Sequence, residues 1–190
     1  MEQILNTQVT QTSNGEPQSS GKPTTTDTIF LIFLGLVLVS LVTIGRLYYI
    51  EGMKLETTKR NGEAWAEWFT KASNERFTAG YEPSVCAGGS ENAHTWGDCF
   101  KALTASGSAL ALTNPFFETP LAQVAQCDKV DRSIIGSIAI DKLEPTPPGS
   151  VIPFTVSQLV ESDPIDKKLK IRVTICDNGS YPIQIAETDF

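Results

Sequence analysis

One long uncharged segment constrains this 190-residue chain more than any other feature. Between Asp27 and Arg46 lie 18 residues without a charged side chain, TIFLIFLGLVLVSLVTIG. As a helix they span roughly 27 Å, close to the thickness of the hydrocarbon core of a bilayer. Arg46 can extend its guanidinium along its methylene stem to the interface, where Tyr48 and Tyr49 also fit, so the apolar run continues to Ile50. We predict a transmembrane helix over residues 28–50.

Two other kinds of segment are long and apolar. The core helix of a globular domain is rarely apolar on every side over such a length. A cleaved signal peptide has a shorter apolar run, with basic residues before it and a small-x-small cleavage site after it. Here the segment is followed by RLYYIEGMKLE, which contains no such site. The sequence therefore favours an uncleaved membrane anchor.

The segment before the span is polar. Residues 1–27 are dominated by Gln, Thr, Ser, Asn, Gly and Pro. They offer little apolar surface whose burial would offset the entropy lost on ordering. We predict a disordered tail or leader over these residues.

After the span, residues 51–79 have the pattern of an amphipathic helix. Its apolar stripe follows the i, i+3, i+4, i+7 spacing of one helix face and consists of Trp65, Trp68, Phe69 and Ala72. We expect the pair Asn61-Gly62 to bend the helix, or to end it and start another. An aromatic stripe of this kind is typical of a core face, so we predict that the helix packs against a folded domain.

Residues 80–190 are predicted to form that domain. Apolar residues alternate in four segments, 133–143, 151–160, 167–176 and 181–187, the last two joined by the turn sequence Asp177-Asn178-Gly179-Ser180. We predict an α+β fold in which these strands form a four-stranded antiparallel meander, covered on its apolar side by the aromatic stripe. Short helices are expected near residues 99–103 and 120–126.

Four cysteines follow the span and none precedes it: Cys86, Cys99, Cys127 and Cys176. An even number on one side of the membrane favours two disulfides in an oxidising compartment. Their separations of 13, 28 and 49 residues contain no close CxxC pair, which argues against a zinc site. Three connectivities exist; proximity alone favours Cys86 with Cys99 and Cys127 with Cys176.

The distribution of basic residues opposes this location. Arg46, Lys54, Lys59 and Arg60 follow the span, whereas Lys22 is the one basic side chain before it. The positive-inside tendency would place the C-terminal domain in the cytoplasm. We give the cysteines more weight and expect a single-pass protein of the cytoplasmic (inner) membrane. Its domain is then periplasmic or extracellular.

No catalytic motif stands out. His94 lies close to Asp98 and Cys99, but a nucleophilic cysteine needs a thiolate, and these cysteines are expected to be oxidised. Asp163 and Asp166 suit a solvated turn better than a calcium loop. We therefore expect no enzymatic activity, cofactor, metal or small-molecule substrate. A net charge of −7 also argues against a nucleic-acid partner.

The order of these elements resembles the type IV pilin and pseudopilin architecture. The resemblance rests on the apolar segment 28–50, the stripe from Trp65 to Ala72, the strands over residues 134–186, and Cys127 with Cys176. It implies an apolar helix that continues as a spine under a sheet domain. The family's glycine-ended leader is not matched, because Gly21 is followed by KPTTTD, and residues 28–45 lack the family's glutamate.

The resemblance implies a structural role. Such a chain would be a subunit of a surface filament or secretion pseudopilus, in which apolar helices pack laterally into a homo- or hetero-oligomer. The alternative is a single-pass, membrane-anchored extracytoplasmic binding or assembly module that does not polymerise. It would hold a partner through the loops of residues 80–130.

Overall fold

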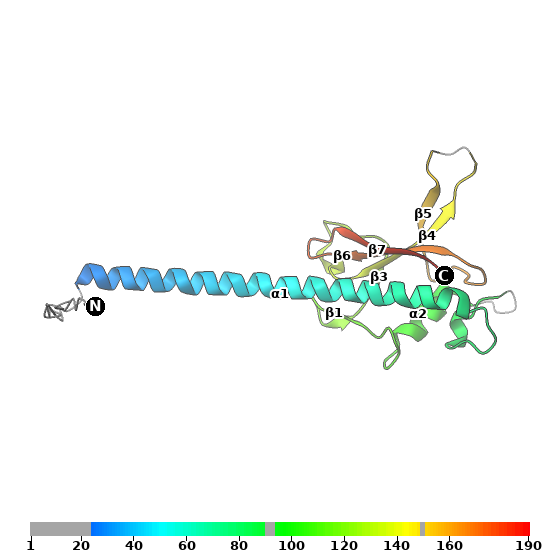
Figure 1. The fold of residues 1–190 in the computed structure, drawn as a ribbon, viewed down its shortest axis with the longest axis horizontal. Helices are drawn as coiled ribbons and strands as arrows, with labels where there is room; N and C mark the ends of the chain where they lie inside the picture. The colour runs from blue at the N-terminus through cyan, green and yellow to red at the C-terminus, as the bar shows by residue number, and fades with distance from the viewer. Residues whose placement is uncertain (1–23, 90–93, 149–150) are drawn as a thin grey trace, which may run out of the picture. The chain divides into compact units, whose positions relative to one another are not determined.

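The computed structural model describes residues 24–89, 94–148 and 151–190, so most of the predicted tail lies outside the described residues. The chain consists of two compact units, with the boundary after Ile44. The first contains the beginning of helix α1 (Thr25–Glu75), and the second contains the rest of that helix and both sheets. Figure 1 shows the order of the elements along the chain.

Helix α1 begins earlier than predicted and is not interrupted. Its start is capped by Thr24 and Asp27: the Thr24 hydroxyl and amide donate to Asp27 Oδ2 at 2.7 and 3.0 Å, as in a capping box. The helix continues through Asn61 and Gly62, so the alternative in which it ends there is wrong. Contacts with distant parts of the chain explain why the helix continues. Asn61 Nδ2 donates to the carbonyl of Thr113 at 2.9 Å, and Gly62 faces the sheet.

The main sheet has five strands and is mixed, which corrects the prediction of a four-stranded antiparallel sheet. Its strands are β3 (Gln123–Val124), β4 (Ile138–Pro145), β5 (Phe154–Gln158), β6 (Lys170–Cys176) and β7 (Pro182–Asp189). The short strand β3 pairs parallel to β4, whereas the other pairs are antiparallel. Strands β1 (Thr113–Asn114) and β2 (Thr119–Pro120) form a separate two-stranded sheet.

The strands do not form a simple meander, because β6 lies directly beside β4 and β5 pairs with the other edge of β4. The burial of the strands explains this order. Ile171, Val173 and Ile175 of β6 are almost completely buried, whereas the residues of β5 are exposed or half-buried. A strand with a fully apolar face gains most in the centre of the sheet under the helix, and the more polar β5 remains at its edge.

The turn between β6 and β7 forms as predicted. Asp177 Oδ1 accepts hydrogen bonds from the amides of Gly179 and Tyr181, both at 2.8 Å, and Ser180 adopts a positive φ of 60°. This side-chain acceptor replaces a backbone partner within the turn, as in an Asx-turn.

The two weaker helix predictions have different outcomes. The one near residues 99–103 is confirmed as the longer helix α2 (Trp96–Thr104), whose start is capped by Thr95. The one near residues 120–126 is wrong, since β2 and β3 lie there. In that region the amide of Leu121 donates to the carbonyl of Leu112, and the carbonyl of Ala122 accepts from the amide of Ile138. These backbone groups are therefore bonded to other segments and not to each other, as they would be in a helix.

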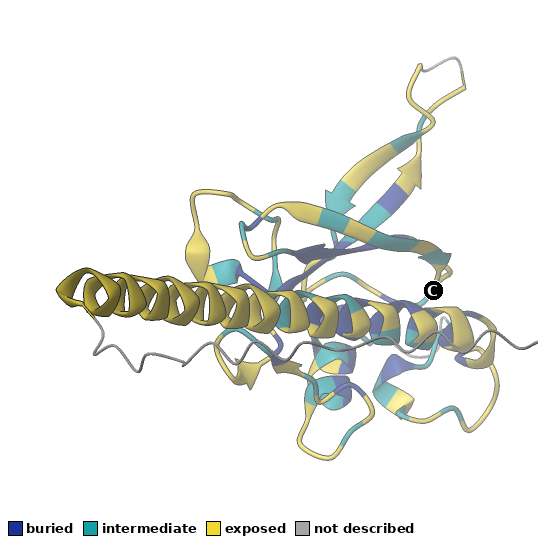
Figure 2. Cartoon of the chain, turned by 60° about the vertical axis from the view of Figure 1, so that its left-hand side comes forward, coloured by how far each residue is buried: buried dark blue, intermediate teal, exposed yellow. Residues whose placement is uncertain are grey.

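The core lies where the second half of α1 meets the sheet on one side and α2 on the other (Figures 1 and 2). Trp65, Phe69, Trp96 and Phe190 have no exposed surface. Trp65 stacks on Phe100 of α2 with ring centroids 5.3 Å apart, and Phe69 meets Phe190 edge-on at 5.0 Å. Of the predicted stripe, Ala72 is also buried and Trp68 is half-buried. The stripe is thus the face of the helix that enters the core.

Gly62 provides a test of this packing. A Cβ built there would lie 2.7 Å from Ile175 Cγ2 and 2.8 Å from Ile185 Cγ1, both on strands that cannot move independently. We expect Gly62→Ala to lower the free energy of unfolding by about 1–2 kcal/mol despite the better helix propensity of alanine.

Gly52 is the matched control, since a Cβ there meets nothing within 4 Å. Gly52→Ala should leave stability unchanged or raise it by up to about 1 kcal/mol. Urea denaturation of the detergent-solubilised chain, followed by tryptophan fluorescence, measures both variants. Equal effects at the two positions would contradict close helix–sheet contact at Gly62.

Candidate functional site

The first half of α1 presents an apolar surface on all sides. Every residue from Thr24 to Met53 is exposed, and α1 is the one helix in the described residues that is long and apolar enough to cross a membrane. Large side chains such as Phe30, Phe33 and Leu36 are each more than 60% exposed. An apolar surface this large is not stable in water, so it identifies a membrane or partner surface.

The polar groups within this segment are satisfied by the helix itself. Ser40 Oγ donates to the carbonyl of Leu36 at 2.8 Å, and Thr43 Oγ1 donates to that of Val39 at the same distance. A helix that bonds both its backbone and its hydroxyl groups internally can enter hydrocarbon without leaving a donor unpaired. Two glycines, Gly35 and Gly45, leave open space where a Cβ would lie. A neighbouring helix could approach the backbone closely at both positions.

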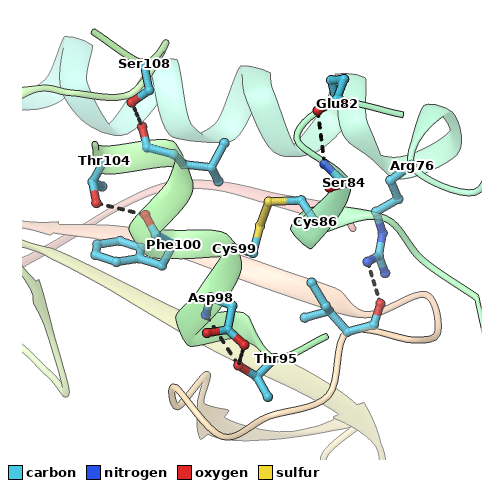
Figure 3. Close-up of a disulfide and its surroundings, with 12 residues drawn as sticks. Arg76, Glu82, Ser84, Cys86, Thr95, Asp98, Cys99, Phe100, Thr104 and Ser108 are labelled. Carbon is cyan, nitrogen blue, oxygen red and sulfur yellow. Dashed lines mark hydrogen bonds between the residues drawn. A yellow bond between two sulfur atoms is a disulfide. The ribbon is translucent and has the colours of Figure 1, made fainter. Parts of the chain in front are cut away.

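At the other end of α1, a buried arginine attaches the helix to the domain. Arg76 follows the last helical residue and is completely buried. Its Nη1 and Nη2 donate to the carbonyls of Ile165 and Lys167, each at 2.6 Å, and Figure 3 shows its guanidinium beside the segment that carries them. The ring of Phe190 lies 4.0 Å from the guanidinium carbon and that of Phe77 lies 4.6 Å from it. These contacts hold the helix end against the chain that leads into β6.

The buried charge of Arg76 depends on the groups packed around it. Burial lowers the pKa of Arg76 to about 10, although the nearby groups of Tyr81 and Asp166 act to raise it. The guanidinium is therefore charged at neutral pH and depends on its two carbonyl acceptors and two aromatic faces. Arg76 Nε and Asp166 Oδ1 are buried without a hydrogen-bond partner among the described residues.

Two disulfides are present, as the sequence predicts. Cys86 of the short 3-10 helix η1 (Ser84–Cys86) is bonded to Cys99 of α2, with Cα atoms 4.7 Å apart (Figure 3). Cys127 is bonded to Cys176 at the end of β6, with Cα atoms 5.3 Å apart. The first bond joins η1 to α2, and the second ties the segment after β3 to the sheet. No described cysteine is free.

The residues considered for catalysis or metal binding do not assemble into a site. Cys99 has no thiolate for His94 to activate, because its sulfur is bonded to Cys86. Asp98 accepts from the hydroxyl of Thr95 at the start of α2, and Asp163 accepts from Lys142 Nζ at 2.8 Å. Within the described ranges, no group of three or more His, Cys, Asp or Glu residues is close enough to hold a metal ion.

Comparisons with known proteins identify no relative. No family model matches the chain, and no match is found among curated proteins or among solved structures. The architecture, a long apolar N-terminal helix followed by a sheet domain, is compatible with that of pilins.

Arg76 is the residue of this site that sequence reasoning missed. It lies in the polar run ASNERFTAG, where an arginine is usually solvated. Its acceptors are 89 and 91 residues away in the sequence, so no local pattern predicts the contact.

We expect Arg76→Met to lower the free energy of unfolding by about 3 kcal/mol, because a buried carbonyl and a partly buried one lose charged donors while most of the side-chain volume is kept. Arg60→Met is the matched control. Arg60 is exposed on the same helix and makes a single 3.6 Å pair with Glu56, so its loss should cost less than about 0.5 kcal/mol. Urea denaturation checks both variants. A cost at position 76 no larger than at position 60 would show that the buried contacts do not stabilise the domain.

Proposed function

We propose that this chain is a structural subunit of a pilin-like surface filament or secretion pseudopilus, anchored by its N-terminal apolar helix. The observation that carries the proposal is that the two halves of α1 lie in different environments. Its first half is apolar and exposed on every side, and its second half is the core element of a disulfide-bonded sheet domain. A simple membrane tether needs an apolar helix, but it does not need that helix to continue as the spine of the domain.

Lateral helix packing would use the surface of residues 28–50. Without a hydrophobic driving force between helices in lipid, association depends on close packing, and glycines permit the closest approach. Gly35 and Gly45 provide open positions of this kind. The surrounding Leu, Ile, Val and Phe side chains would then pack against neighbouring subunits once the helix leaves the bilayer.

In a filament, Arg46 would need a polar environment. It is the one charged residue between Asp27 and Glu51, and it is exposed. A guanidinium next to an apolar stretch is stabilised by a carboxylate, by the membrane interface or by an aqueous surface. In the filament we assign it to the outer surface or to an acidic group of an adjacent subunit.

The proposed location of the domain is the periplasm or the cell exterior. Two disulfides support an oxidising compartment, where such bonds persist. The basic residues after the span favour the opposite orientation, and we give the covalent bonds more weight.

A second candidate is a membrane-anchored extracytoplasmic binding or assembly module that does not polymerise. The observation in its favour is the absence of an acidic residue from positions 28–45, where the pilin pattern has a glutamate. The two candidates differ in what they require of the apolar helix. A filament subunit requires a particular surface, and a tether requires only hydrophobicity and length.

The location is tested by intact mass of the membrane-extracted chain after thiol alkylation, with and without prior reduction. We expect no alkylation before reduction and four added groups after it, one for each cysteine. Four alkylated thiols without reduction would place the domain in the cytoplasm. The same mass reports whether the first 20 to 30 residues, roughly the polar segment, have been removed.

Polymerisation is tested at Gly35. Gly35→Trp fills a position that is open in the single chain, so it should leave membrane insertion intact while reducing the sheared filament fraction by about tenfold or more, because close helix contact is lost.

Phe33→Trp is the matched control, since it adds tryptophan at a position that is already bulky and exposed. Immunoblots of the filament and membrane fractions give the readout. A filament yield unaffected by Gly35→Trp would favour the tethered module. The same conclusion would follow if the filament yield were unchanged when residues 28–45 are replaced by a polyleucine span.

A further inference from the structure

The main sheet forks at one end. Strand β4 pairs with β6 only as far as Lys142 opposite Ile171, whereas it pairs with β5 as far as Pro145 opposite Phe154. Over residues 143–145 the edge of β4 that faces β6 therefore has no strand partner in the described part of the chain. Figure 1 shows the β4–β5 hairpin leaving the sheet at this point, while β6 continues beside β7.

The fork encloses a groove of about 780 Å³. One wall is the edge of β4 at Leu143, Glu144 and Pro145, and the other is the chain entering β6 at residues 167–170. An unpaired strand edge carries backbone donors and acceptors that can pair with another extended chain. On this edge Pro145 has no N–H and contributes only a carbonyl acceptor, so the N–H donors of the edge come from the residues before it.

The rim of the groove carries four lysines and two carboxylates, Glu144 and Asp189, so it is net basic although the chain as a whole is acidic. Lys167, Lys168 and Lys170 line it, and none of the three belongs to an ion pair among the described residues. Lys168 Nζ donates to the neutral Asn74 side chain at 3.0 Å, and Lys170 Nζ lies 4.6 Å from the ring centre of Phe154. On a chain of net charge −7, three lysines without carboxylate partners mark a site that favours a negatively charged ligand.

We infer that this groove binds an extended acidic segment of a partner protein. The segment adds as a strand to the edge of β4 at residues 143–145, and its carboxylates lie against Lys167 and Lys168. Backbone pairing supplies affinity in this mode of recognition, and the side chains along the groove supply specificity. The proposal goes beyond the filament role, because it requires neither polymerisation nor a particular apolar helix.

The groove favours a peptide over other negatively charged ligands. A small anion such as phosphate is usually held by several convergent donors, whereas these lysines are spread along the rim. The acidic chain repels nucleic acid. An extended acidic peptide uses both features at once, the free strand edge and the basic rim.

The probe is a fluorescein-labelled nine-residue peptide in which glutamate alternates with valine and threonine. Anisotropy titration against the detergent-solubilised full chain should show saturable binding. N-methylation of the central amides of the peptide should weaken that binding by about tenfold or more, because backbone pairing is lost while every charge is kept. This comparison uses the unaltered protein, so it does not depend on the folding of a variant.

The charge requirement is tested with the double variant Lys167→Glu/Lys168→Glu, which should weaken binding by about tenfold or more. Arg76 bonds to the backbone carbonyl of Lys167, so the substitution leaves that contact in place. Lys129→Glu is the matched control: it reverses an exposed lysine just after Cys127, whose disulfide lies at the opposite end of β6. It should change binding by less than about twofold.

Three results would overturn the inference. Equal binding of the N-methylated peptide would show electrostatic attraction without strand addition. Equal effects of the groove and control variants would show that the lysines of the rim do not form the site. Absence of peptide binding, with self-association of the chain that the double variant abolishes, would assign the groove to a second copy instead.

Discussion

The structure depends on the burial of one face of α1 between the sheet and α2. Trp65 and Phe69 project from that face into a cluster with Trp96 and Phe190, and each of the four is completely buried. Aromatic side chains bury large areas and add edge and stacking contacts, so they contribute much of the stability of a small core. Arg76 completes the same junction at the helix end. The second half of the helix is therefore part of the core of the domain.

This dependence explains the close approach at Gly62. The helix backbone can approach the strands this closely only where a small residue faces them, and here Ile175 and Ile185 occupy the space that a side chain would fill. The usual reading of glycine as a helix breaker fails at this position, because tertiary contacts supply more stability than the propensity of the residue removes. The same packing places the apolar face of β6 in the centre of the sheet and leaves β5 to pair with the outer edge of β4. The fork and its groove follow from that arrangement.

The two halves of α1 satisfy different environments with one continuous backbone. The first half exposes apolar side chains and bonds its own hydroxyl groups, which suits lipid or helix packing. The second half exposes charged residues such as Glu63 and Glu67 on the face opposite the core, which suits water. The two disulfides stabilise the domain further by joining η1 to α2 and the segment after β3 to the end of β6. These features together support an anchored domain whose helix has a structural as well as an anchoring role.

By itself, the sequence determined the features that depend on local pattern. These are the apolar segment, the aromatic stripe of α1, the alternation that marks β4 to β7, the turn at Asp177 and the presence of two disulfides. The structure places the helix start three residues before the predicted one, where Thr24 and Asp27 form a capping box. Only the tertiary structure decided which strand edges meet, that β3 joins in parallel, that Gly62 continues the helix and that Arg76 is buried. Each of these is set by contacts between residues far apart in the chain, and the free energy of such contacts does not appear in any local pattern.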